Sequence, residues 1–119
     1  MSDRLSDYGY NFQIKIISAL LKDSSFLQQV QDILDISFFE NNSIQWLTDT
    51  VIKYHLEYKE SPTLEVFKVK LEDLDDDILK KQTVEHLKDV VKNLDATDLD
   101  FVMQQTIDFC KNQTLKKAI

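Results

Sequence analysis

Residues 12–22, FQIKIISALLK, contain the pattern that decides the fold of the chain. The apolar residues in this stretch recur at helical spacing, at Phe12, Ile16, Ile17, Leu20 and Leu21. This spacing places them on one face of an α-helix. We therefore predict an amphipathic helix from about residue 7 to Lys22, with that face directed toward a core.

Outward from this helix, the chain continues with a break and then a shorter helix. Asp23-Ser24-Ser25 interrupts the apolar stripe, and Ser25 with Gln28 has the spacing of a capping box. In a capping box, the first side chain accepts a hydrogen bond from a free backbone N–H at the start of a helix. A second helix is therefore expected to open at Ser25 and to run through Leu34.

Two further helices are predicted in the middle of the chain. Asn42 or Ser43 can cap a helix whose stripe is Ile44, Leu47, Val51, Tyr54 and Tyr58. That helix should end at 59–61, because Pro62 cannot continue it. Pro62 instead suits the first turn of a following helix. The apolar residues of that short helix are Leu64, Phe67, Val69, Leu71 and Leu74.

Residues 72–77, EDLDDD, are acidic at five of six positions. The simplest interpretation is a negative cluster at a helix N-terminus, where the helix dipole favours carboxylates. The alternatives are an acidic docking patch or a cation loop. A calcium-binding EF-hand loop needs a glycine at its sharp turn, and none is present here, so calcium is excluded.

Two longer helices are predicted in the last third of the chain. The first carries Leu79, Val84, Leu87, Val90, Val91 and Leu94 on one face. Residues 95–97 form a short reversal, and Thr97 with Asp100 has capping-box-like spacing. A short connection between two long helices predicts an antiparallel hairpin.

The expected fold is therefore all-α, with a helical head over residues 1–74 and the helical hairpin over residues 75–111. Residues 112–119 contain no helix-ending signal and are expected to be the start of a linker helix, cut within a longer protein.

The final helix has an unusually wide apolar arc. Leu99, Met103, Thr106, Ile107 and Cys110 form one sector, and Phe101, Val102 and Phe109 form another. A surface helix needs an apolar face of only about 100°. Either this helix lies at the centre of the domain, or its second face meets another chain.

Composition excludes several classes of protein. The chain has 119 residues, with one Gly, one Pro and one Cys, so it cannot supply the glycine turns of an all-β fold, a Rossmann unit or a phosphate-binding loop. A net charge of -7 disfavours binding to DNA or to anionic membranes and favours protein partners. No apolar run is long enough for a membrane span or a signal peptide.

No catalytic constellation is visible among the reactive side chains. His55 and His86 belong to no metal-binding motif, and each is expected to be a polar surface residue or a satisfied core histidine. Cys110 lies on the apolar sector of its helix and is expected to be buried and inert. We therefore predict no catalytic, cofactor-binding or metal-binding residue in this chain.

The order of several motifs resembles the opening of DnaB-type replicative helicases. The motifs are Leu20-Leu21-Lys22-Asp23 with Phe26-Leu27, then Phe38-Phe39-Glu40-Asn41, then YHLEYKESPTL at 54–64 with Leu71. The third motif is similar to the family's junction between two helices, in which a Tyr precedes Pro-[Ser/Thr]. Residues 108–119 look like the run that leads into the linker helix in the tailed-phage branch.

This resemblance implies a collar domain of a hexameric helicase in the primosome. Neighbouring subunits would pair through their hairpins, and primase and a helicase loader would dock on this domain. ATP and Mg²⁺ would be used by an absent motor domain, so the fragment itself would hold no cofactor and would not be an enzyme. The compartment implied is the cytoplasm of a bacterium or a phage-infected cell. The interface residues expected on this basis are Leu87, Val91, Phe101, Val102 and Phe109.

Two other functions fit the same sequence. One is the helicase-binding domain of a primase, which has a similar helical layout. The other is a stand-alone acidic helical adaptor or DNA mimic. A small helical enzyme is disfavoured, because no convergent titratable site is visible in the sequence.

Overall fold

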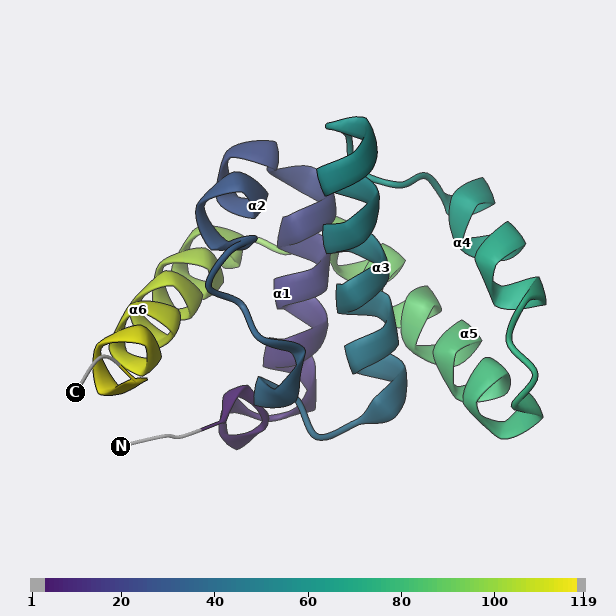
Figure 1. The fold of residues 1–119 in the computed structure, drawn as a ribbon, viewed down its shortest axis with the longest axis horizontal. Coiled ribbons are helices and arrows are strands. Elements are labelled where there is room, and N and C mark those ends of the chain that lie inside the picture. Colours follow the sequence, from purple (N-terminus) through teal and green to yellow (C-terminus); the bar gives the residue numbers. More distant parts are fainter. Residues whose placement is uncertain (1–3, 118–119) are drawn as a thin grey trace.

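A computed structural model describes residues 4–117, and within this range the chain forms helices and no strands (Figure 1). The α-helices are α1 (Tyr10–Lys22), α2 (Ser24–Val30), α3 (Asn42–Tyr58), α4 (Leu64–Glu72), α5 (Asp77–Lys92) and α6 (Leu99–Lys117). Short 3₁₀ helices are η1 (Leu5–Tyr8), η2 (Ile36–Phe38) and η3 (Asn93–Asp95). The all-α prediction is confirmed.

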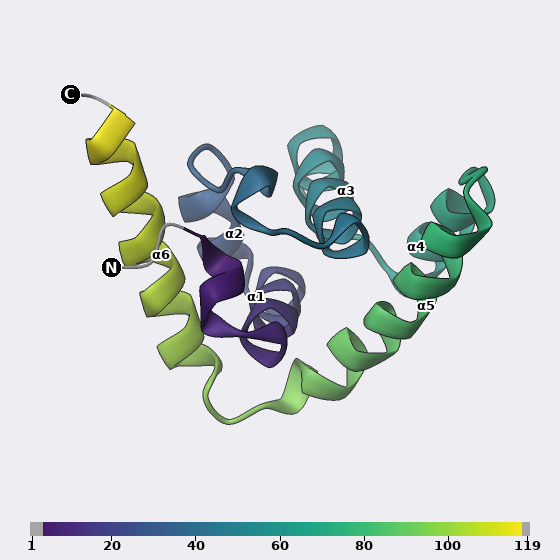
Figure 2. The same ribbon diagram turned by 90° about the horizontal axis from the view of Figure 1, so that it is seen from below.

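Helix α1 is the centre of the domain. It packs against α2, α3, α5 and α6, which surround it in both views (Figures 1 and 2). Every residue from 13 to 20 except Lys15 is buried. The single apolar face expected for this helix is therefore too narrow. The burial extends around α1 because four other α-helices pack on it. On its other side, Ser18 faces α5 and donates a hydrogen bond of 2.7 Å to the Val90 carbonyl.

Two of the predicted helix caps are wrong by one or two residues. The Asp23 carboxylate, not Ser25, accepts the hydrogen bond from the Phe26 N–H that opens α2, at 3.1 Å. Asn41 caps α3 by accepting from two backbone N–H groups, whereas Asn42 and Ser43 were expected. In both places an Asp or Asn just upstream of the expected cap takes the role, as these residues are strong N-caps.

The acidic segment 72–77 lies at a helix start, as its simplest interpretation predicted. Asp76 is the N-cap of α5 and accepts a hydrogen bond of 3.0 Å from the Leu79 N–H. Asp77 lies in the first turn of the same helix. Both carboxylates are therefore near the positive end of the helix dipole.

The expected pairing of the last two helices is not confirmed. Helices α5 and α6 each pack on α1, and Figure 2 shows them diverging from η3 along two sides of the domain. The reason is that each helix directs its buried face to α1 rather than to the other: Val90 of α5 and Val102 and Cys110 of α6 are all buried. Helix α6 also continues without interruption through residues 112–117, while 118–119 lie outside the described residues.

Helix α4 is the element least embedded in the domain. It is joined to α5 by residues 73–76, and it lies beside α5, away from α1 and α2 (Figures 1 and 2). Its buried residues are Phe67 and Leu71. Leu64 and Val69, in contrast, expose about half or more of their surface. A nine-residue helix that buries two side chains leaves much of its apolar surface open.

Candidate functional site

The five residues predicted to form an interface do not lie on one surface. Val102 and Phe109 are buried in the core, so they are not available to a partner. Leu87 and Val91 lie on α5, where Leu87 is almost covered and Val91 is 37% exposed. Phe101 of α6 is 61% exposed and points away from the core. The expected surface is thus divided between two helices that diverge.

The two phenylalanines of α6 differ in burial, because Phe109 faces the core and Phe101 does not. Phe109 packs edge-on against Phe38, with ring centroids 5.2 Å apart, and it also meets Tyr8 at 6.2 Å. Phe101 makes no such ring contact within residues 4–117, since it lies outside the buried face that Leu99 and Val102 form. The wide apolar arc of α6 is therefore mostly explained by packing within the chain, with Phe101 left exposed.

A groove between α4 and α5 is the most distinctive surface feature. Its volume is about 460 Å³. The α4 wall consists of Leu64, Lys68 and Leu71, and the α5 wall consists of Val84, Leu87, Lys88, Val91 and Lys92. The five aliphatic side chains form a continuous apolar lining. Two of the predicted interface residues, Leu87 and Val91, are part of it.

The groove continues toward α1 at one end. A second hollow of about 390 Å³ shares Leu64 and Val91 with it and adds Pro62, Phe67 and Leu94 among its walls. Because Leu64 begins α4 and Val91 is near the end of α5, this shared boundary shows that the two helices run in opposite directions. The open apolar surface thus extends along the full length of α4.

Three lysines border the groove, and its lining contains no Asp or Glu. Lys88 makes an exposed contact of 3.4 Å with Glu85. Lys68 and Lys92 have no ion pair with any carboxylate among the residues that the structure describes. In a chain with 21 acidic and 14 basic residues, a groove whose charged lining residues are all lysines is a local reversal of charge. The adjoining hollow differs, because Asp95 and Lys22 are both in its lining.

Helical spacing explains how the groove is built. On α4, Leu64, Lys68 and Leu71 follow one another at steps of four and three, so they share a face. The same rule aligns Val84, Leu87 and Val91 on α5. The sequence shows apolar residues at helical spacing on both helices, but spacing alone does not reveal that the two stripes face each other across a groove with lysines beside them. The available signal was a short helix with more apolar residues than one buried face can use.

A polar cluster joins α1, α3 and α5 on another side of the domain. The Tyr10 hydroxyl donates a 2.5 Å hydrogen bond to Asp89, and burial together with this carboxylate raises the pKa of Tyr10 above its ordinary value. Ser43 forms a short hydrogen bond with Nδ1 of His86. Burial lowers the pKa of His86, although Asp89 and Glu85 oppose that effect.

This cluster has the residue types of a nucleophilic site without its accessibility. Ser43 is completely buried, and its hydroxyl also lies 2.7 Å from Oδ1 of Asn41, the cap of α3. A nucleophile must reach a substrate, and this hydroxyl is enclosed between two protein partners. We therefore interpret the Ser43–His86 contact as an extension of the helix cap that fastens α5 to α3.

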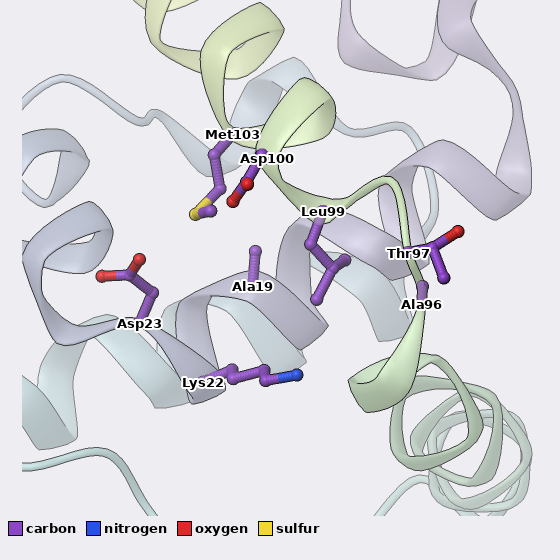
Figure 3. Close-up of a pocket in the computed structure, with 8 residues that line it drawn as sticks. All are labelled: Ala19, Lys22, Asp23, Ala96, Thr97, Leu99, Asp100 and Met103. Atoms are coloured by element: carbon purple, nitrogen blue, oxygen red, sulfur yellow. The ribbon is translucent and has the colours of Figure 1, made fainter.

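A small mixed pocket of about 330 Å³ lies where the end of α1 approaches the start of α6 (Figure 3). Figure 3 shows Asp23, Asp100 and Met103 around it, with Lys22 directed along its edge. The polar groups on the α1 side already have partners: Asp23 caps α2, and the Lys22 amine donates a 2.8 Å hydrogen bond to the Leu94 carbonyl. These two interactions account for the charged residues on the α1 side of the pocket without a ligand.

The two other reactive residues are in the core. Burial raises the pKa of the Cys110 thiol to about 12, so it stays protonated and unreactive at neutral pH. His55 is buried, and its Nδ1 lies 3.0 Å from Oε1 of Gln31. Among residues 4–117, no group of three or more His, Cys, Asp and Glu side chains could hold a metal ion.

Comparisons with models of protein families, with curated proteins and with solved structures found no match to this chain. None of the helices in the described part of the chain is both long enough and apolar enough to span a membrane. The surface feature that bears most directly on function is the apolar groove between α4 and α5.

Proposed function

We propose that this chain is a non-catalytic docking domain that binds another protein through the α4–α5 groove. The observation that carries this proposal is the combination of an apolar lining, exposed Leu64 and Val91, and a border of lysines on an otherwise acidic chain. Contiguous exposed apolar surface is costly for a monomer and is typical of interaction sites.

The specific setting that we propose is the collar of a DnaB-type replicative helicase. Support comes from the order of the motifs in the sequence and from their positions in the fold. Phe38 and Phe39 are buried immediately before α3, and the motif at 54–64 spans the junction of α3 and α4. In this setting, the groove would receive primase or the helicase loader, and the exposed Phe101 would contribute to contacts between subunits.

The test is a binding measurement with purified primase and helicase loader from the same genome. Immobilised chain should bind at least one of them. Val91→Glu should abolish this binding, because it places a charge in the apolar lining. The matched control is Val69→Glu, the same change at an α4 residue that is 63% exposed and lies outside the groove.

Four outcomes would contradict the proposal. If neither protein binds, or if Val91→Glu and Val69→Glu have equal effects, the groove is not the docking site. If the chain binds a replicative helicase instead of primase or loader, it is the helicase-binding domain of a primase. ATP hydrolysis by the chain alone would contradict both assignments.

A further inference from the structure

We propose that the α4–α5 groove receives an acidic amphipathic helix of the partner. This inference rests on the proposed docking function and adds the chemistry of what is docked. It commits to three properties of the partner segment: a helical conformation, aliphatic side chains along one face, and carboxylates on both sides of that face.

The shape of the groove fits a helix about two turns long. Leu64 and Leu71 on one wall, like Val84 and Val91 on the other, are seven residues apart, which corresponds to about 10 Å along a helix axis. A partner helix laid along such a groove contributes anchors at positions i, i+3 or i+4, and i+7. These anchors would fill the space between the two walls and cover the aliphatic lining.

The positive charges at the groove favour a partner segment that carries negative charge. Lys68 comes from the α4 wall, and Lys88 and Lys92 come from the α5 wall, so both sides of the groove carry positive charge. Lys68 and Lys92 have no carboxylate partner in the described part of the chain. A helix with Asp or Glu beside its apolar face would pair with these amines from both edges, whereas a basic helix would be repelled.

Other acidic occupants fit less well. The acidic segment 72–77 of a second copy offers one apolar residue, Leu74, which is already half-buried against its own core. It therefore cannot fill a lining of five aliphatic side chains. Nucleic acid has no row of aliphatic side chains, so it cannot cover the apolar lining of the groove.

The experiment uses three synthetic peptides with the full 119-residue chain. The acidic probe is a helix of about four turns with leucines at every third or fourth position and glutamates elsewhere. The second peptide replaces each glutamate by lysine. The third keeps the composition of the acidic probe but distributes the leucines around the helix. Binding is measured by fluorescence anisotropy, and the site is located by NMR shifts of the methyl groups of Leu64, Leu87 and Val91.

We expect the acidic probe to bind at least about tenfold more tightly than either other peptide. Its affinity should fall as the salt concentration increases. The double variant Lys68→Glu and Lys92→Glu should reverse the preference in favour of the basic peptide. Lys81→Glu, an exposed residue of α5 outside the groove, should leave the preference unchanged. Circular dichroism confirms that each variant is folded.

The outcomes separate this inference from the docking function. If the basic peptide binds at the groove methyl groups as tightly as the acidic one, the groove is still a docking site, but the proposal that its partner is acidic is wrong. If the scrambled acidic peptide binds equally well, the attraction is charge alone and the helical partner is wrong. If the free chain forms dimers that Val91→Glu dissociates, the occupant is a second copy. If no peptide shifts the groove methyl groups, both the inference and the groove as docking site fail.

Discussion

Helices α1 and α4 have similar apolar spacing in the sequence but opposite positions in the fold. Every residue of α1 between 13 and 20 except Lys15 is buried, and four other α-helices pack around it. Helix α4 buries Phe67 and Leu71 and leaves Leu64 and Val69 exposed. The comparison shows that a helical stripe indicates an apolar face but does not indicate whether that face is covered by the same chain. The difference arises from the neighbours that the connections bring together.

The largest expected effect tests the same contrast within one helix, α6. Phe109→Ala should reduce the free energy of unfolding by about 3–5 kcal/mol, because it removes a buried ring that packs against Phe38. Phe101→Ala should change it by less than about 0.5 kcal/mol, because that ring is exposed. Urea unfolding measures both values. Similar losses for the two variants would mean that Phe101 also contributes to the core.

The next prediction compares α1 and α4 directly with a matched pair of leucines. Leu20→Ala should cost about 2–5 kcal/mol, since Leu20 is completely buried beside several helices. Leu64→Ala should cost less than about 1 kcal/mol, since about half of its surface is already exposed. Thermal and urea unfolding of the two variants should give this order. A larger loss at Leu64 would show that α4 is a core element.

A smaller effect is expected at the start of α4. The Thr63 hydroxyl accepts a hydrogen bond of 3.4 Å from the Val66 N–H, and Thr63→Ala should cost about 1 kcal/mol or less. Because α4 buries few residues, the loss should be local, with faster amide exchange in α4 and unchanged exchange in α1. Hydrogen exchange followed by NMR is the measurement. Equal acceleration in both helices would mean that α4 unfolds only with the whole domain.

The smallest effect concerns the hydrogen bond from Tyr10 to Asp89, which fastens α1 to α5. The pKa of Tyr10 is raised in the folded state. Its contribution to the free energy of unfolding is therefore complete below the ordinary tyrosine pKa, and it decreases as the pH rises past about 10. The stability difference between the wild type and Tyr10→Phe should therefore shrink above that pH. Urea unfolding at a series of alkaline pH values checks this. A constant difference would mean that Tyr10 titrates alike in both states.

Much of the fold could be predicted because its signals are local. The stripe from Phe12 to Leu21, the break at Asp23 and the stop before Pro62 all act within a few residues of the structure they specify. The caps were misplaced because several neighbouring residues near positions 23–25 and 41–43 can accept a hydrogen bond, and the structure uses the upstream one.

The site was harder to predict because it depends on contacts between distant segments. Val102 and Phe109 have the same spacing whether they meet another chain or their own core, and the structure places them in the core. Leu87 and Val91 line the groove, and their role as interface residues stays a prediction. The α4 residues that face them could not be recognised from the sequence. Lys68 and Lys92 line the same groove only because the turn at 73–76 brings α4 beside α5.

The light attachment of α4 also has an evolutionary consequence. Since the fold requires chiefly Phe67 and Leu71 from this helix, substitutions at its remaining positions are nearly free of selection for stability. We therefore expect residues such as Leu64 and Lys68 to change quickly when a partner changes, and the buried residues of α1 to change little. Related chains should show their greatest sequence divergence in α4, and exchange of this one short helix should transfer partner preference between them.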